Sequence, residues 1–173
     1  MKSIVFVVLV SLSSTLLAQG LTETFDEECS CFVITNHYEN GQISSVHHEN
    51  VNRNRVGAEK VYSAGGNLNY ERNWEKGKLH GSGTFYHPDG SVYINEQYVE
   101  GQKVGKWNFQ DPQGTPIQTI EYTGHGNDGA YSHFYTGQLY FVQKLENGAL
   151  VNSEVVNQEL YDIVQEEGSA TTK

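Results

Sequence analysis

The sequence has little cysteine, proline or positive charge, and each shortage narrows the class of protein. Its 173 residues include two cysteines and three prolines, and 11 Lys and Arg stand against 21 Asp and Glu. A formal net charge of -10 lacks the basic footprint that nucleic-acid binding requires, and it suits anionic lipid headgroups no better. Beyond residue 18 there is no apolar run of the ~20 residues that a membrane-spanning helix needs. We therefore expect no nucleic-acid partner and no membrane insertion of the mature chain.

The N-terminus carries the one long apolar stretch. Lys2 provides a positive start, residues 4–10 are apolar, and a small residue, Ala18, ends the segment. This layout is typical of a secretory signal peptide over residues 1–18. Cleavage near Ala18 leaves 155 residues (173 minus 18), which is enough for one domain. The predicted location is therefore exported, in the periplasm, the cell envelope or outside the cell.

Cys29 and Cys31 are the only cysteines. In an exported protein an even number of cysteines favours a disulfide. Residues i and i+2 of a straight strand, however, lie near the ~7 Å limit that a disulfide can span between Cα atoms. Three interpretations stay open: a local disulfide in a bent segment, two free thiols, and a pair used for intermolecular bridging or redox work.

A spacing of 24 residues recurs along the chain and decides the fold class. The glycine columns at this spacing are Gly57, Gly81, Gly105 and Gly129; Gly66, Gly90 and Gly114; and Gly77 and Gly101. The aromatic columns are Tyr38, Tyr62 and Tyr86; Trp74, Tyr98 and Tyr122; and Phe85 and Phe109. Turn signals fall about every 12 residues, as expected for consecutive antiparallel strands.

Two kinds of turn separate the strands. P-D-G at 88–90 and P-Q-G at 112–114, with E-N-G at 39–41, place Gly where a turn needs positive φ. The segments 75–81 and 100–105 each contain two glycines, which predict a wider reversal. Between turns, apolar and polar residues alternate as in a half-exposed strand. The sequence predicts an all-β fold, an elongated antiparallel meander of ~24-residue β-hairpin repeats over residues 37–152.

The two ends differ from the repeats. Residues 19–36 form an acidic segment that contains Cys29 and Cys31, and residues 153–167 predict a helix that caps the last hairpin. Its apolar stripe consists of Val156, Leu160, Ile163 and Val164. Ser153 or Asn157 is the expected N-cap and Gly168 the expected stop, with a flexible tail at 168–173. Docking of a partner is the alternative role for this helix.

The stretches 74–86 and 98–109 resemble the MORN repeat (membrane occupation and recognition nexus). The resemblance rests on the pattern Y-x-x-G-x-x-x-G-x-W/x-x-F combined with a D-G or N-G turn, and it covers residues 37–150. It is closest to variant MORN repeats of bacterial exported proteins, many of which carry an antitoxin-like label. The fourth unit departs from the pattern, since His125 stands where Gly is expected. The resemblance implies an antiparallel meander with a binding or scaffolding role, and it supplies no catalytic residue.

The sequence contains fragments of cofactor-binding motifs and several histidines, but the neighbouring residues that such sites require are absent. G-H-G-N-D-G at 124–129 matches the dinucleotide fingerprint, but a strand pattern follows it where a helix is required. G-K at 77–78 is followed by Leu79 instead of the Ser or Thr of a phosphate-binding loop. No metal motif accompanies the histidines near turns, which are His80, His87, His125 and His133. We expect no cofactor, no metal and no catalytic residue.

The leading hypothesis is a non-enzymatic exported module that binds a protein partner or a glycan, or that acts as a scaffold. Its candidate binding surface is an aromatic stripe, since aromatic residues concentrate binding energy. The stripe consists of Trp74, Tyr86, Tyr98, Trp107, Phe109 and Tyr122. Packing within the sheet is the alternative role of these side chains. Because a single sheet cannot cover both of its faces, we also expect self-association into a homo-oligomer.

Two other functions stay open. An envelope hydrolase would use carboxylates or histidines at the turns, where Asp89, Glu96, Glu100 and Asp111 recur. A neutralising, immunity-like partner of a secreted effector would agree with the antitoxin-like label of the similar repeats.

Overall fold

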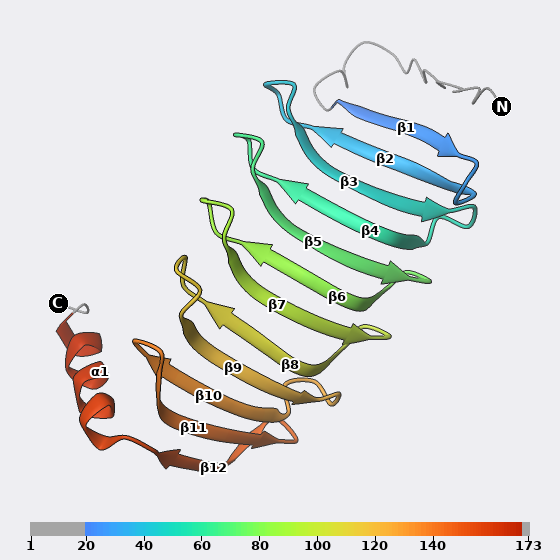
Figure 1. Ribbon diagram of the computed structural model, residues 1–173. Coiled ribbons are helices and arrows are strands. Elements are labelled where there is room, and N and C mark those ends of the chain that lie inside the picture. The colour runs from blue at the N-terminus through green and yellow to red at the C-terminus, as the bar shows by residue number, and fades with distance from the viewer. Residues whose placement is uncertain (1–19, 171–173) are drawn as a thin grey trace. The chain divides into compact units, whose positions relative to one another are not determined.

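The computed structural model describes residues 20–170 and contains twelve β-strands followed by one α-helix (Figure 1). The predicted signal peptide, residues 1–18, lies outside the described residues. The strands are β1 (Leu21–Asp26), β2 (Cys31–His37), β3 (Ile43–Asn50), β4 (Arg55–Tyr62), β5 (Leu68–Glu75), β6 (Lys78–Tyr86), β7 (Val92–Val99), β8 (Gln102–Gln110), β9 (Pro116–Thr123), β10 (Gly129–Tyr135), β11 (Gln138–Glu146) and β12 (Ala149–Val155). The helix is α1 (Gln158–Ala170).

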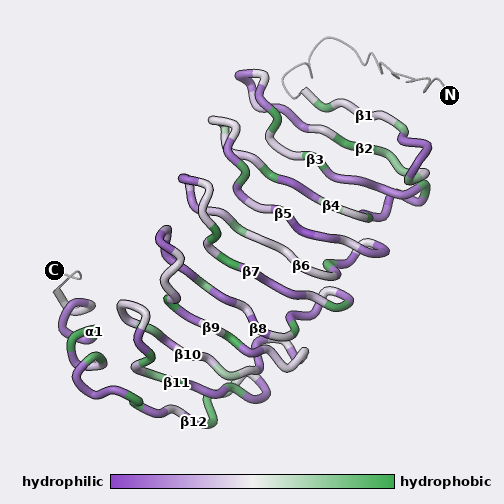
Figure 2. The backbone as a smooth tube through the Cα atoms, in the orientation of Figure 1, coloured by the Kyte–Doolittle hydropathy of each residue, from purple (hydrophilic) through white to green (hydrophobic). Residues whose placement is uncertain are grey.

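The strands pair in chain order from β1 to β12, and all of the pairing is antiparallel. This confirms the predicted all-β meander with a short C-terminal helix. The chain divides into two compact units, residues 1–83 (unit 1) and 84–173 (unit 2), with the boundary inside β6. Short hydrophobic stretches are interspersed among hydrophilic ones along the strands of both units (Figure 2). In unit 1, Ile34, His47 and Glu59 are buried, and in unit 2 the most buried apolar residues are Trp107 and Ile120, which face each other on β8 and β9.

The first kind of turn is as expected. In each turn the N–H of a glycine donates to the carbonyl oxygen three residues earlier: Gly41 to Tyr38, Gly66 to Ser63, Gly90 to His87 and Gly114 to Asp111. The φ angles of these four glycines lie between 79° and 87°, a conformation that residues with a Cβ rarely adopt. The 24-residue glycine column therefore marks equivalent turns of consecutive hairpins.

The second kind of turn is tighter than expected, so the predicted wider reversals at 75–81 and 100–105 are wrong. The chain reverses over two residues that both have positive φ: Lys76–Gly77, Glu100–Gly101, Thr136–Gly137 and Asn147–Gly148. Such primed two-residue turns match the right-handed twist of the flanking strands. The second glycine of each predicted reversal, Gly81 or Gly105, lies inside a strand instead.

Both ends of the chain contribute more strand than the sequence indicated. The acidic segment 19–36 contains β1 and most of β2, so the sheet begins well before residue 37. The predicted helix 153–167 begins too early, because Ser153 pairs with Gln143 inside β12. Asn157 is the N-cap, with its Oδ1 accepting the N–H of Leu160 at 3.2 Å. The helix continues past Gly168 to Ala170, so Gly168 is not its stop.

Within unit 2, the helix α1 packs against β11. Its Tyr161 ring lies 5.4 Å from the Phe141 ring of β11, and the hydroxyl of Tyr135 donates to the carboxylate of Glu167 at 2.9 Å. Within residues 20–170, no helix is long and apolar enough to cross a membrane.

Candidate functional site

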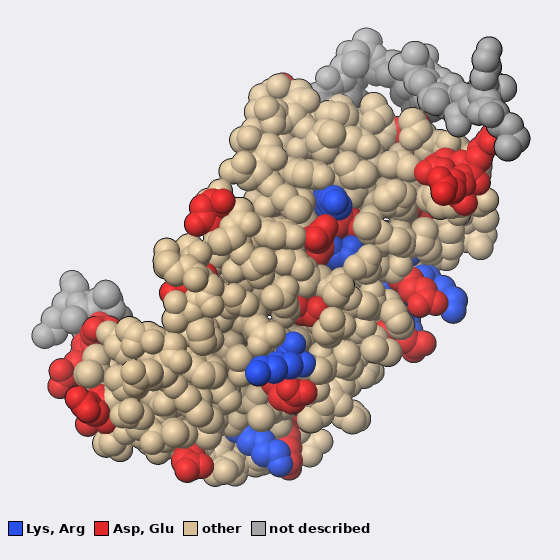
Figure 3. Space-filling view, viewed as in Figure 1, with Lys and Arg blue, Asp and Glu red and all other residues tan. Residues whose placement is uncertain are grey.

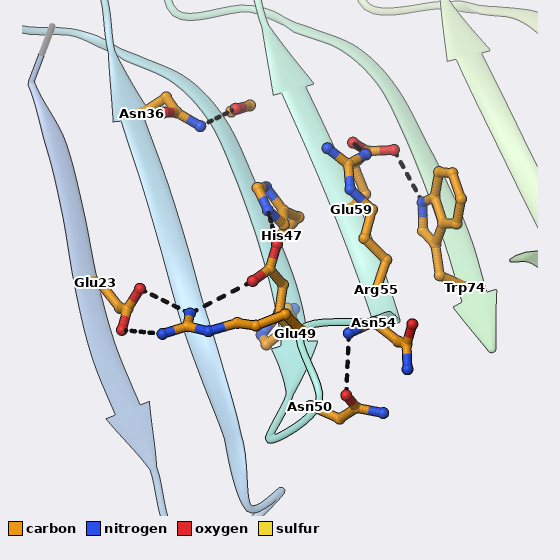
Figure 4. Close-up of polar contacts among 12 residues, drawn as sticks. Glu23, Asn36, His47, Glu49, Asn50, Asn54, Arg55, Glu59 and Trp74 are labelled. Carbon is orange, nitrogen blue, oxygen red and sulfur yellow. Dashed lines mark hydrogen bonds and ion pairs between the residues drawn. The ribbon is translucent and has the colours of Figure 1, made fainter. Parts of the chain in front are cut away.

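One face of unit 1 carries a network of charged and aromatic side chains (Figure 4). It starts at the turn between β3 and β4, where Asn50 Oδ1 accepts the backbone N–H of Asn52 at 2.9 Å and of Asn54 at 3.0 Å. These two bonds from a side chain to the backbone stabilise the turn. They hold Arg53 at a φ of 63°, from which its side chain reaches the sheet face.

The Arg53 guanidinium joins two strands to this turn. It donates to both carboxylate oxygens of Glu23 on β1, at 2.8 and 3.0 Å, and to Glu49 on β3 at 3.4 Å. It also lies 4.0 Å from the centre of the Phe32 ring on β2. The hydrogen bond from Arg53 holds the pKa of the Glu23 carboxyl below its usual range. The second oxygen of Glu49 lies 3.4 Å from Nε2 of the buried His47.

Glu59 on β4 is the centre of a second cluster. Its carboxylate is 5% exposed, pairs with the Arg55 guanidinium and accepts the indole N–H of Trp74 at 2.9 Å. Arg55 lies 5.1 Å above the Trp74 ring. A buried carboxylate is tolerated when it is paired and hydrogen-bonded in this way. Trp74, a predicted stripe residue, is therefore an anchor for a buried charge.

Each of the carboxylates of Glu23, Glu49 and Glu59 has a partner within these two clusters. In the close-up each carboxylate faces a guanidinium, an indole or an imidazole (Figure 4). Among residues 20–170 no group of three or more His, Cys, Asp or Glu side chains is placed to hold a metal ion. These residues were not among those predicted from the sequence. The available signals were H-x-E at 47–49 and R-x-x-x-E at 55–59, whose even spacing places the pairs on one strand face.

Three predicted stripe residues form a packed row in unit 2. Tyr98 contacts Trp107 and Trp107 contacts Tyr122, edge to face, with ring centroids 5.2 and 5.0 Å apart. Tyr131 on β10 extends the row at 6.1 Å, and Lys103 lies over the Trp107 and Tyr122 rings. Trp107 is only 6% exposed, and burial raises the pKa of Tyr122. These rings pack the sheet face and present little ring surface to a ligand.

The structure separates the six predicted stripe residues. Phe109 contacts Tyr93, which also contacts His87, and these three rings form a small cluster of their own. Tyr86 is half-buried at the end of β6. Tyr98, Trp107 and Tyr122 make one continuous row, because β7, β8 and β9 are adjacent strands.

Acidic and histidine side chains at the turns of unit 2 have structural contacts. Asp89 accepts both the N–H and the hydroxyl of Ser91, and the hydroxyl contact contributes most to lowering the pKa of Asp89. Asp111 accepts the N–H groups of two later turn residues. The His87 ring donates from Nε2 to the carbonyl oxygen of Gln110 at 2.9 Å. These groups, which a hydrolase would need, close turns and join neighbouring hairpins.

His133 lies in an aromatic cluster beneath α1. Its ring is 5.7 Å from Phe141 and 6.4 Å from Tyr140, and the Tyr161 ring of α1 contacts both of those rings. Gln118 reaches Nδ1 of His133 at 3.3 Å. Burial lowers the pKa of the imidazole, so a neutral ring is favoured at this position.

The sheet edge formed by β12 is the most apolar exposed segment. Leu150, Val151, Val155 and Val156 are 57%, 52%, 36% and 49% exposed, and they fall within seven residues. The opposite end of the chain is acidic. Asp and Glu gather at the turn between β1 and β2 in the space-filling view (Figure 3), where Asp26, Glu27 and Glu28 are exposed.

Cys29 and Cys31 form a local disulfide, one of the three interpretations that the sequence left open. Their Cα atoms are 5.2 Å apart, which is shorter than in a straight strand and suits a disulfide. Ser30 between them has a φ of 51°, and this left-handed residue supplies the bend.

The chain matches no known family model and no curated protein. The resemblance to MORN repeats therefore stays a prediction.

Proposed function

We propose that this protein is an exported, non-enzymatic scaffold that binds a protein partner. The observation that carries the proposal is the exposed apolar edge at β12. Four large apolar side chains within seven residues remain largely in contact with water there. Clusters of exposed apolar residues on a soluble domain mark interaction sites. An edge strand adds unpaired backbone groups, which give a partner strand both affinity and direction.

A protein partner is favoured over a glycan by the state of the aromatic residues. Glycan recognition by stacking needs open ring faces, whereas Tyr98, Trp107 and Tyr122 are between 6% and 8% exposed. The apolar edge at β12 contains no aromatic residue. Aliphatic side chains and backbone groups suit another polypeptide.

A non-enzymatic role is supported by the use of the titratable groups. Asp89 and Asp111 accept turn N–H groups, and His87 donates to a carbonyl oxygen of the next hairpin. Each group would have to leave its structural partner to act as an acid or base. Export is supported by the disulfide between Cys29 and Cys31, because disulfides persist in oxidising compartments.

The proposal is tested by affinity capture from the cell envelope fraction with the immobilised mature chain. Val155→Lys places a charge on the apolar edge, and Ile117→Lys is the matched control on β9, where Ile117 is 44% exposed. We expect one stable protein partner with the wild type and the control, and at least about tenfold less with Val155→Lys, equivalent to ~1.4 kcal/mol. Recovery of no partner by the wild type, or equal recovery by both variants, would contradict the proposal.

The hydrolase alternative is tested with the double variant His87→Gln and Asp89→Asn. Both replacements keep hydrogen-bonding groups at the turn, so the hairpin should remain folded. A scaffold retains its partner in this variant. Loss of a hydrolytic activity that the purified wild type displays would instead favour an enzyme.

A further inference from the structure

The outer side of β12 offers backbone hydrogen-bonding groups to another strand. The N–H of Val156 donates to the carbonyl oxygen of Tyr140 at 2.9 Å. In an antiparallel pair these groups point toward the partner strand at one residue and away from it at the next. The N–H and C=O of Ser153 and Val155 therefore point away from β11. Within residues 20–170 no strand lies on that side, since β12 ends the sheet (Figure 1).

The β12 edge lacks most of the features that protect edge strands from pairing. Natural edges carry lysine, proline or several charges, or are very short. β12 has seven residues, and Glu154 is its only charged side chain. The one irregularity in its pairing leaves Val151 without a counterpart on β11, and residues 152–155 are regular. This regular segment can form a ladder on its free side.

We propose that β12 pairs with β12 of a second copy of this chain, antiparallel, about a two-fold axis at Ser153. In this register Ser153 faces Ser153 of the second copy, and Val151 faces Val155. Leu150 faces Val156, so the exposed apolar side chains of each copy meet those of the other. The N–H and C=O groups of Ser153, which point away from β11, then meet those of Ser153 in the second copy.

Two neighbouring registers would also bring outward-pointing N–H and C=O groups of one copy opposite those of the other. Both registers are less favourable. An axis at Glu154 would set two carboxylates directly opposite each other, and like charges in that position are destabilising. An axis at Asn152 would set Glu154 against Leu150. With the axis at Ser153, Glu154 faces Asn152 of the second copy, beyond which lies Lys144 on β11. Lys144, which pairs with Glu146 of its own chain at 2.7 Å, then stands in the same cross-strand row as Glu154 of the second copy.

A second copy suits β12 better than the β1 edge of another molecule does. β1 carries Glu23 and ends at Asp26, next to Glu27 and Glu28 (Figure 3). Pairing of β12 with β1 would place Glu154 near this acidic segment, and it would leave an open edge on every molecule, so growth would not stop. Pairing of β12 with itself closes after two copies.

Three variants of the mature chain, each with one cysteine added beside the Cys29–Cys31 disulfide, identify the register. With the axis at Ser153, the two Cα atoms of Ser153 lie about 5.5 Å apart, within the range that a disulfide spans. The Cα atoms of Asn152 or of Glu154 in the two copies would lie roughly 8 Å apart, which is beyond that range. Mild oxidation should link Ser153→Cys into a dimer, while Asn152→Cys and Glu154→Cys stay monomeric. All three positions are exposed, so we expect the three variants to fold equally well.

Charged substitutions at Asn152 distinguish an effect on dimer formation from an effect on folding. Asn152→Lys faces Glu154 of the second copy and should tighten the dimer in sedimentation or light scattering, although it lies beside Lys144 within its own chain. Asn152→Glu should weaken the dimer and favour the monomer fold. Opposite changes in the dimer constant and in monomer stability are expected, and a folding defect cannot produce them.

This inference rests on the proposed binding role of the β12 edge, and the outcomes separate the two. A monomer at all concentrations without cross-linking of Ser153→Cys overturns the self-pairing. Preferential cross-linking of either neighbouring variant overturns the register. If capture of another protein still depends on Val155, the scaffold proposal survives that loss. If Ser153→Cys dimerises but no other protein is captured, self-pairing stands and the proposed partner fails.

Discussion

Asp128 holds the turn that leads into β12 by binding Gly148. One carboxylate oxygen accepts the N–H of Gly148 at 2.8 Å, and the other accepts the N–H of Asn147 at 2.7 Å. The carboxylate stands before β10, and the two N–H groups belong to the turn between β11 and β12. The position of the apolar edge therefore depends on a charge that lies 20 residues earlier in the chain.

Replacement of Asp128 by Asn should loosen this turn. The two N–H groups, chiefly that of Gly148, hold the pKa of Asp128 below its usual range. A carboxyl with a depressed folded pKa stabilises the fold above its unfolded pKa of ~3.9, and the stability is lost as the pH falls through the folded value. We expect faster amide exchange in β11 and β12 for Asp128→Asn at neutral pH, and little further effect of the substitution in strong acid. Glu121→Gln, an exposed change on β9, is the control, and equal exchange in the two variants would contradict this role.

Acidification should weaken the docking of α1. His133 has a pKa below its ordinary value of about 6.5, because burial disfavours the charged ring. The groups that face it are the Gln118 amide and the rings of Tyr140 and Phe141, and a hydrogen bond with the Gln143 amide opposes the effect of burial. Stability is therefore present above pH ~6.5 and lost as the pH falls toward the lower folded value.

The measurement is the free energy of unfolding between pH 5 and 8 for the wild type and for His133→Gln. We expect the wild type to lose stability below pH ~6.5 and the variant to show a smaller slope there. His125→Gln, at an exposed turn position, is the matched control for the removal of one imidazole. An identical slope in wild type and His133→Gln would exclude His133 as the source.

Thr136→Asn should stabilise the hairpin of β10 and β11. Thr136 has a φ of 49° in a two-residue turn, a conformation that is costly for a β-branched residue and much less so for asparagine. The equivalent position in the last hairpin already holds Asn147, with a φ of 52°. We expect a gain of about 0.5–1 kcal/mol in thermal or chemical unfolding. The reciprocal change Asn147→Thr should cost a similar amount, and a loss of stability with Thr136→Asn would refute the strain argument.

Glu59→Ala should destabilise unit 1 far more than a surface carboxylate change does. It leaves the Trp74 indole N–H and the Arg55 guanidinium without their acceptor. The expected cost is about 2–4 kcal/mol, below the ~3–5 kcal/mol of a fully buried pair, because the Arg55 side chain is 38% exposed. Glu71→Ala, which removes an exposed ion pair with Lys60, should cost ~0–1 kcal/mol. Denaturant unfolding followed by tryptophan fluorescence measures both, and comparable costs would show that Glu59 is not a special site.

The fold could be predicted because its information is local and repeated. Gly66, Gly90 and Gly114 each need a positive φ, and their spacing reports hairpin length directly. The tight turn at Lys76 could not be anticipated, because a lysine with positive φ has no sequence signal of its own. Ser153 and Asn157 are both good N-caps, and pairing of Ser153 with β11 decided between them.

The candidate sites were less predictable because they depend on neighbours across strands. The columns placed Tyr98 and Tyr122 correctly in one row, but periodicity does not report whether a ring is covered. Arg53 connects β1, β3 and a turn through a long side chain, and its partner Glu23 is 30 residues away. The apolar residues of β12 were assigned in part to a helix, which hid the exposed edge.

The turn of Asn50 and Arg53 sets a limit on how this chain can be re-engineered or diversify in length. A foreign peptide inserted near Gly90 enters open space, since no heavy atom lies within 4 Å of the position that a Cβ would occupy there. The same insertion between Asn50 and Asn54 would displace the guanidinium that binds Glu23 on the first strand. The turn at 88–90 thus has more open space for a grafted loop than the turn at 50–54, although the two turns look equally exposed in the sequence. Gly90 itself has to be kept, because its φ of 87° strains any other residue.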